Sequence, residues 1–363
     1  MRLCRTETIG PISFYAMLRR FGSARAALDV LPRLARRGER ATTVTAVTRA
    51  AAEAELGALH RPGARLVCWG ESGYPSALAA IEDAPPILTV LGQAQLLQQP
   101  MIAVVGARNA SANGRRLARD LAAELGLGGL VVISGLARGI DAAAHLGALE
   151  TGSVAVVAGG ADVVYPAENR GLYDALARQG AIVAELPLGT EPRASHFPRR
   201  NRIISGMALG VVVVEAAARS GSLITARLAL EQGREVFAVP GSPLDPRARG
   251  CNDLLRHGAT LTENAADILS QLGPQLRGAE PLRPNRPVAM PVALQLPSQS
   301  TAHPVSEEAG QELILGRLGP TPVAVDELVR QCQMSAAAVA TLLLELELAG
   351  RVERHPGNLV SSR

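Results

Sequence analysis

The chain has 363 residues, of which 47% are hydrophobic and 19% charged, and its formal net charge is +4. This length predicts two or three domains, while the lack of any run of 18 apolar residues and of a signal-peptide segment after Arg2 predicts a cytoplasmic protein without membrane contact. No lysine occurs among the 37 basic residues, which excludes a conventional P-loop ATPase, and the four widely separated cysteines indicate reduced thiols rather than disulfides or a zinc site.

Residues 1–65 are rich in Ala and Arg and follow a helical pattern. Turns are expected at Ile9-Gly10-Pro11 and Phe21-Gly22-Ser23, because Gly and Pro interrupt helices. We therefore expect a small N-terminal helical domain.

From Met101 onward, short β-rich apolar runs alternate with helical stretches, and each run is followed by a turn of small residues. Strands that are apolar on both faces are typical of a parallel sheet covered by helices on both sides. The pattern predicts an extended, doubly wound, mainly parallel Rossmann-like α/β domain over residues 66–273, with ligands bound beyond the carboxyl ends of its strands. The expected strand segments are Met101–Gly106, Leu130–Gly135, Ser153–Gly160, Ala181–Pro187, Gly210–Ala216 and Glu235–Gly241.

The turn after the first of these strands reads VGARNASANG. Gly106 permits a tight turn, Arg108 follows it, and Ser111 is a candidate cap for the next helix. Arg108 either meets a ligand at the edge of the sheet or is the surface side chain of a structural turn.

The second strand ends in SGLARGIDAAAH. Gly135 and Gly139 leave room for a ligand backbone in a turn that also contains Ser134 and Arg138. The spacing differs from the G-x-G-x-x-G fingerprint, so dinucleotide binding is not implied.

Two titratable residues follow in the same segment. Asp141 is predicted either to orient an arginine or to cap the helix. His145 is predicted to be a packed histidine rather than a catalyst.

The third strand leads into GGADVVYPAEN. Tyr165 has two equal interpretations here, as a ring that stacks on a base or as the packing anchor of the loop. Asn169 is expected to form hydrogen bonds with the backbone.

The run HFPRRNR, residues 196–202, places an aromatic ring among arginines. Rings and guanidinium planes suit single-stranded nucleic acid, because every base offers a face for stacking while phosphates meet charge. A second small-residue turn, before a helix near Leu223, would direct backbone N–H groups at phosphate. The residues expected to contribute from this region are Arg193, Phe197, Arg199, Arg200, Asn201, Arg202, Ser220, Gly221 and Ser222.

The end of the α/β domain, from about Leu254 to Leu269, supplies apolar residues and is followed by a proline-rich segment. We expect it either to form a homodimer interface or simply to pack the last helix on its own sheet. The candidate interface residues are Leu254, Leu255, Leu261, Ile268 and Leu269.

Residues 274–306 are rich in proline and predict an extended linker. Three helical segments and a hairpin follow over residues 307–363, which is the pattern of a winged helix. Its expected recognition helix, Ser335 to Leu348, contains glutamates and no basic residue, which argues against ordinary major-groove binding.

In this order, the motifs VGAR, SGLARGID, GGADVVYP, FPRRNRIISG, SGSLITA and VPG resemble the DNA-processing protein A (DprA/Smf) family. The resemblance implies an N-terminal sterile-alpha-motif-like domain, an extended Rossmann domain and a winged helix. It also implies a homodimer that binds single-stranded DNA, protects incoming DNA and loads the RecA recombinase during natural transformation, with the dimer formed at the same edge of the sheet.

Carried over to this sequence, the resemblance assigns DNA binding to Arg108, the Ser134 to Gly139 turn, Phe197, Arg200, Asn201, Arg202 and the Ser220 to Ser222 turn. Two departures stand out. Ala194 occupies a position that is often basic in the family, with Arg193 adjacent to it, and VGAR replaces the commoner VGSR. No catalytic residue, metal or cofactor is expected.

Two other functions compete with this interpretation. The first is a nucleotide-processing enzyme of the cytokinin-releasing type, although the acid nearest to the SGSLITA turn, Glu231, is displaced from the position that a general acid or base would need. The second is a winged-helix transcription factor with a ligand-sensing core, which the lack of cations on the recognition helix disfavours.

Overall fold

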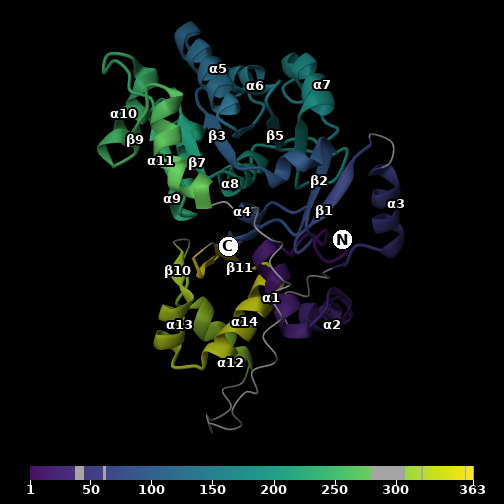
Figure 1. The fold of residues 1–363 in the computed structure, drawn as a ribbon. Helices are drawn as coiled ribbons and strands as arrows, with labels where there is room; N and C mark the ends of the chain where they lie inside the picture. The colour runs from purple at the N-terminus through teal and green to yellow at the C-terminus, as the bar shows by residue number, and fades with distance from the viewer. Residues whose placement is uncertain (37–44, 60–62, 279–306, 320–321, 356, 363) are drawn as a thin grey trace. The chain divides into compact units, whose positions relative to one another are not determined.

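The computed structural model describes residues 1–36, 45–59, 63–278, 307–319, 322–355 and 357–362. These residues form two compact units (Figure 1). One unit combines Met1–Ala54 with the region from Val288 to Arg363, and the other comprises Glu55–Pro287. No helix in the described ranges is both long and apolar enough to span a membrane.

The larger unit is built on a nine-stranded sheet whose strands lie in the order β1-β2-β6-β5-β4-β3-β7-β8-β9. All neighbouring strands from β6 to β9 in this order pair in parallel. The chain begins this parallel part in the middle and extends it first on one side of β3 and then on the other, which places a topological switch point between β3 and β7. The strands are β1 Arg65–Cys68, β2 Ile87–Gly92, β3 Met101–Val105, β4 Val131–Ser134, β5 Ser153–Val157, β6 Ala181–Ala184, β7 Gly210–Val213, β8 Glu235–Ala238 and β9 Thr260–Leu261.

Helices connect these strands. The helix α5 packs beside α6, and α8 packs against β3, β4 and β5 (Figure 1). The helices of this unit and the one that leads into it are α3 Arg49–Leu59, α4 Ser76–Ala79, α5 Ala112–Leu127, α6 Ile140–Ala148, α7 Arg170–Gln179, α8 His196–Met207, α9 Gly221–Glu231, α10 Arg249–Arg256 and α11 Ala265–Gly278.

The central strands are buried on both faces, as their continuous apolar runs predict. Ile102 and Val104 of β3 belong to a core cluster with residues of α5, α6 and α11. Successive side chains of a strand point to opposite faces, so the intervening Ala103, which is also fully buried, faces the other side of the sheet. The predicted doubly wound fold is confirmed.

Three strands, β1, β2 and β9, were not among the expected ones. The strands β1 and β2 form an antiparallel pair, and β2 also pairs antiparallel with β6. The strand β9 has two residues, which is too short to give a sequence pattern.

The smaller unit contains the helices α1 Pro11–Phe21 and α2 Ala24–Arg36, separated by Gly22 in the left-handed conformation. The winged helix comprises α12 Glu307–Leu315, β10 Val323–Ala324, α13 Val325–Cys332, α14 Ala336–Leu348, β11 Val352–His355 and β12 Leu359–Ser362. Leu344 and Leu348 of α14 are buried in one cluster with Leu3, Met17 and Leu31. The N-terminal helices and the winged helix therefore share apolar contacts within this unit.

Two expectations at the end of the larger unit need correction. The helix α11 continues to Gly278 and includes Pro274, so the predicted linker does not begin at residue 274; residues 279–306 lie outside the described part. Ile268 is fully buried in the main core, and Leu269 packs against that core, because α11 directs one face onto its own sheet. The Ile268 side chain is therefore not open to a second subunit, whereas Leu269 is only partly buried.

Candidate functional site

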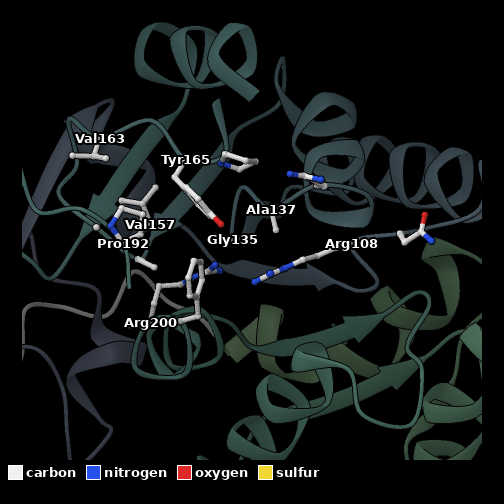
Figure 2. A pocket seen from close by; sticks show the side chains of 14 residues that line it. Arg108, Gly135, Ala137, Val157, Val163, Tyr165, Pro192 and Arg200 are labelled. Carbon is white, nitrogen blue, oxygen red and sulfur yellow. The ribbon is translucent and has the colours of Figure 1, made fainter. Parts of the chain in front are cut away.

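A cavity of about 410 Å³ opens beyond the carboxyl ends of β3, β4 and β5, close to the switch point of the sheet (Figure 2). Turns after all three strands and the start of α8 contribute to its wall. The lining residues are Arg108, Asn109, Gly135, Ala137, Arg138, Val157, Ala158, Gly159, Val163, Tyr165, Pro166, Pro192, Phe197 and Arg200.

The turn after β3 carries Arg108, which is exposed and lines the cavity. Ser111 ends this turn and caps α5, since its hydroxyl accepts a hydrogen bond from the Gly114 amide at 2.8 Å. The same hydroxyl donates to the carboxylate of Glu215 at 2.6 Å. Ser111 therefore fixes the turn that presents Arg108 and does not itself line the cavity.

The turn after β4 is organised by Asp141. Its carboxylate accepts hydrogen bonds from the amides of Gly135 at 3.2 Å and Ala137 at 3.3 Å. Gly139 has a φ of +74°, and a Cβ atom at this position would overlap the carbonyl oxygen of Ala107. Glycine is thus required for the turns after β3 and β4 to pack together.

Arg200 of α8 reaches beneath this second turn. It is only 7% exposed, and a Cβ atom on Gly135 would overlap its guanidinium group, so Gly135 makes room for the arginine. Burial lowers the pKa of Arg200 to about 10, with the nearby Asp141 acting in the opposite direction, so the group remains cationic at neutral pH. Its Nε atom has no hydrogen-bond partner among the described residues.

Phe197 lies at the centre of a cluster of rings and cations. The Arg108 guanidinium lies 5.2 Å from the centroid of its ring, and that of Arg200 lies 6.0 Å from it. The ring of Tyr165 is 5.7 Å away at an interplanar angle of 53°. Figure 2 shows the Tyr165 hydroxyl and the Arg108 guanidinium directed toward the same space. Tyr165, which the sequence left undecided between stacking and packing, is thus a lining residue with 48% of its surface exposed.

Arg202 has a different position from the one that the sequence predicted. It is buried and donates hydrogen bonds to Glu185 Oε1 and to the Asp83 carbonyl oxygen, both at 2.6 Å, and its Nε lies 3.4 Å from Asp83 Oδ2. Residues two positions apart on a helix face different directions, so Arg200 and Arg202 of α8 cannot both point into the cavity. We therefore assign Arg202 a structural role in place of DNA binding.

The other candidate residues fall into four groups. Arg138 lines the cavity and pairs with Glu168 at 2.8 Å, whereas Arg193 and Arg199 are exposed outside the lining set. Asn169 holds the turn after β4 by donating to the carbonyl oxygen of Leu136 at 2.9 Å.

The last group serves the fold. The Ser134 hydroxyl is buried and donates to the Val104 carbonyl oxygen at 2.6 Å. Ser220 caps α9, and the amide group of Asn201 donates to the Gly221 carbonyl oxygen at 3.4 Å. Ser134, Gly106, Asn201 and the turn of Ser220, Gly221 and Ser222 lie outside the lining residues of the cavity.

His145 is fully buried, and its Nδ1 lies 2.7 Å from the Ser153 hydroxyl, as expected of a packed histidine. Burial, assisted by the charge of Arg200, lowers its pKa from 6.5 to about 3. Below pH 6.5 the His145 imidazole becomes protonated in the unfolded chain but stays neutral in the folded protein. The free energy of unfolding therefore decreases as the pH falls from 6.5 toward the folded-state pKa of about 3.

We expect His145→Gln to reduce the pH dependence of stability by up to about 1.4 kcal/mol per pH unit between roughly pH 6 and pH 4. Urea unfolding at several pH values measures it. His257→Gln is the control for the loss of a histidine, because His257 is exposed. An unchanged slope in His145→Gln would mean that His145 is protonated in the folded protein.

Together, the sheet and the cavity define a Rossmann-like α/β protein with a site that combines buried and exposed arginine with aromatic side chains. Residues 65–273 match the family model described as DNA recombination-mediator protein A. The chain belongs to this family. Residues 1–58 match a DprA-like N-terminal HHH domain, and residues 298–358 match a DprA winged helix domain.

Several relatives are similar over most of their length. Protein Smf of Escherichia coli is 40% identical over 318 residues, which cover 87% of this chain and 82% of the relative. The crystal structure of DNA processing protein A from Streptococcus pneumoniae has a TM-score of 0.64 at 34% identity and covers 74% of this chain and 95% of that one. DNA processing protein A from Helicobacter pylori, whose structure was described together with its single-stranded DNA binding mode, has a TM-score of 0.54 at 28% identity, with 58% of this chain and 96% of that one covered.

Proposed function

We propose that this protein is a cytoplasmic recombination mediator that binds single-stranded DNA. The observation that carries the proposal is the cavity in which Arg108 and Arg200 lie beside the rings of Phe197 and Tyr165. Cations attract phosphate, and aromatic rings stack on bases without regard to sequence. The single-stranded DNA binding of the Helicobacter pylori relative supports the same class of ligand.

The size of the cavity favours single strands over duplex. A volume of about 410 Å³ admits a base only if that base is unpaired and turned away from its neighbours. Duplex DNA would have to lose stacking and pairing, at a cost of a few kcal/mol, before a base could enter. Arg193 precedes α8 and Arg199 lies on it. Both side chains are exposed and are available to the phosphates of the rest of the strand.

We further propose that the protein protects incoming DNA and loads RecA onto it during natural transformation. RecA filament formation on single-stranded DNA coated with single-strand-binding protein, followed by electron microscopy, tests this step. The wild type is expected to increase the number of filaments, and Arg108→Ala is expected not to. Equal numbers of filaments with and without the wild-type protein would refute RecA loading while leaving DNA binding intact.

The alternative of a nucleotide-processing enzyme gains no support from the geometry. Glu231, its nearest candidate acid, is the last residue of α9 and pairs with Arg227 at 3.2 Å. It lies outside the lining of the cavity, and none of the lining residues is a carboxylate. We therefore propose a binding function rather than catalysis.

We propose that the protein is a homodimer formed at the β9 edge of the sheet. Leu261 of β9 is 52% exposed and Leu244, in the loop after β8, is 90% exposed, while Leu254 and Leu255 of α10 are partly exposed. An open edge strand presents unpaired backbone groups that a second copy would satisfy. Two cavities on one particle would raise the affinity for long strands through avidity.

Leu261→Glu is expected to convert the dimer to a folded monomer, because it places a charge in the proposed interface. Light scattering measures the change. Leu146→Glu is a matched control, since Leu146 is 51% exposed and belongs to α6 rather than to the proposed interface. If Leu261→Glu remains dimeric, the dimer does not use β9.

A further inference from the structure

The helix α14, which has the place of the recognition helix in the winged helix, is apolar on two sides. Val339 and Leu346 belong to the core of the winged helix itself. Leu344 and Leu348 belong instead to the cluster that contains residues of α1 and α2. The helix therefore takes part in two separate cores within the smaller unit.

The helical period shows that these two sides are roughly opposite. At about 100° per residue, Leu344 and Leu348 follow each other on one side of the helix, and Val339 and Leu346 lie on the other. Thr341 shares the side of the first pair. In DNA-binding helix-turn-helix proteins the side of the recognition helix that faces away from its own core enters the major groove. Leu344, Leu348 and Thr341 occupy that side here.

This outward side is covered by the N-terminal helices. Leu344 is 3% exposed and Leu348 is fully buried, in one cluster with Met17 of α1. At the margin of the contact, the guanidinium of Arg20 donates a hydrogen bond to the Thr341 hydroxyl at 3.1 Å. The helix α2 packs against α14, which lies between α13 and α2 (Figure 1). The side that would read DNA is thus already occupied by protein.

The charges of α14 are also unsuited to nucleic acid. The helix contains no basic residue, and its two acids are held by the winged helix. Glu345 accepts a hydrogen bond from the Gln311 amide at 3.0 Å, and Glu347 pairs with Arg354 of β11 at 3.2 Å. Phosphates and base edges are bound by cationic and amide side chains, which this helix lacks. Its leucines are instead suited to an apolar partner.

We infer that α14 is a protein-docking helix whose partner is the helical pair α1 and α2 of the same chain. The winged helix is then a brace for the N-terminal helices and does not bind DNA through α14. DNA could reach this side only by displacing α1 and α2, which would place two buried leucines against phosphate. The inference is independent of the cavity in the larger unit, so its failure would leave the proposed function intact.

Photo-cross-linking of the full-length protein tests this assignment. Ala337 is exposed one turn before Thr341, and its carbonyl oxygen accepts a hydrogen bond from the Thr341 hydroxyl at 3.0 Å. The variant Ala337→p-benzoylphenylalanine would be irradiated alone, with an oligothymidine and with duplex DNA. The expected main product is a link to a peptide from residues 1–36, with the same yield under all three conditions.

Three results would overturn the inference. The first is a main product linked to either DNA. The second is a link to a second copy of the chain, which a mixture of isotopically light and heavy protein detects as a hybrid product. The third is the lack of any link to residues 1–36.

Leu348→Glu in the cross-linking protein is expected to lower the yield of this link at least about tenfold, because burial of an unpaired carboxylate is strongly unfavourable. Met17→Glu changes the partner helix instead and is expected to have the same effect. Ala340→Glu is the matched control, since it adds the same charge at an exposed position of α14 and should retain the link. An undiminished link in a folded Leu348→Glu or Met17→Glu protein would overturn the inference. The first measurement needs none of these charged variants, so its result holds whether or not they fold.

Discussion

Arg202→Ala is expected to lower the free energy of unfolding by about 3–5 kcal/mol, which is typical when one partner of a buried ion pair is removed. The side chain is 7% exposed and contacts Asp83 and Glu185, which are themselves largely buried. Its loss would leave two carboxylates without their cation, together with an unfilled space beside α8. Urea unfolding followed by circular dichroism measures the change.

Arg199→Ala is the matched control, since it removes the same charge from an exposed position on the same helix. We expect it to change stability by less than about 0.5 kcal/mol. If the two variants unfold at the same urea concentration, the pairing of Arg202 contributes nothing to stability and its role must be reconsidered.

Arg108→Ala is expected to weaken the binding of single-stranded DNA by about tenfold or more, the loss that corresponds to roughly 1.5–3 kcal/mol for a hydrogen bond to a charged group. The melting temperature should remain nearly constant, because Arg108 is exposed and no ion pair holds it among the described residues. Fluorescence anisotropy with labelled oligothymidine measures the affinity.

Arg178→Ala controls for the general effect of net charge. Arg178 is exposed near the end of α7 and does not line the cavity. Its removal should alter the affinity only slightly, through long-range electrostatics that salt screens. Equal losses in the two variants would show that charge alone, rather than the cavity, determines binding.

The sequence predicted the parallel sheet well because burial on both faces leaves a strong local pattern. Val131–Ser134 and Gly210–Val213 are strands for this reason. By contrast, β9 has two residues, and its pairing with β8 depends on contacts that no local pattern records. Pro274 indicated the end of the domain in the sequence, yet it lies within α11, since a proline in a helix can be tolerated where packing holds the turn.

The site was predicted as a set of turns, and only part of that set converges. Arg108, Gly135, Arg138, Phe197 and Arg200 line one cavity, as their positions after strands and at the start of α8 suggested. The sequence could not show which of Arg200 and Arg202 enters the cavity, because Asp83 and Glu185, the partners of Arg202, are distant along the chain. The helical period of α8 was the available signal, since it separates the two side chains by more than half a turn.

The central claim, that the cavity binds single-stranded DNA, is tested most directly by measuring the affinity of the full-length protein for an oligothymidine and for its duplex with oligodeoxyadenosine. Anisotropy titrations at about 50 and 200 mM salt would show the preference for the single strand and the electrostatic contribution to the binding free energy. We expect tighter binding of the single strand at each salt concentration and a steep loss of affinity at the higher one. Equal affinity for the duplex, or no dependence on salt, would contradict the account.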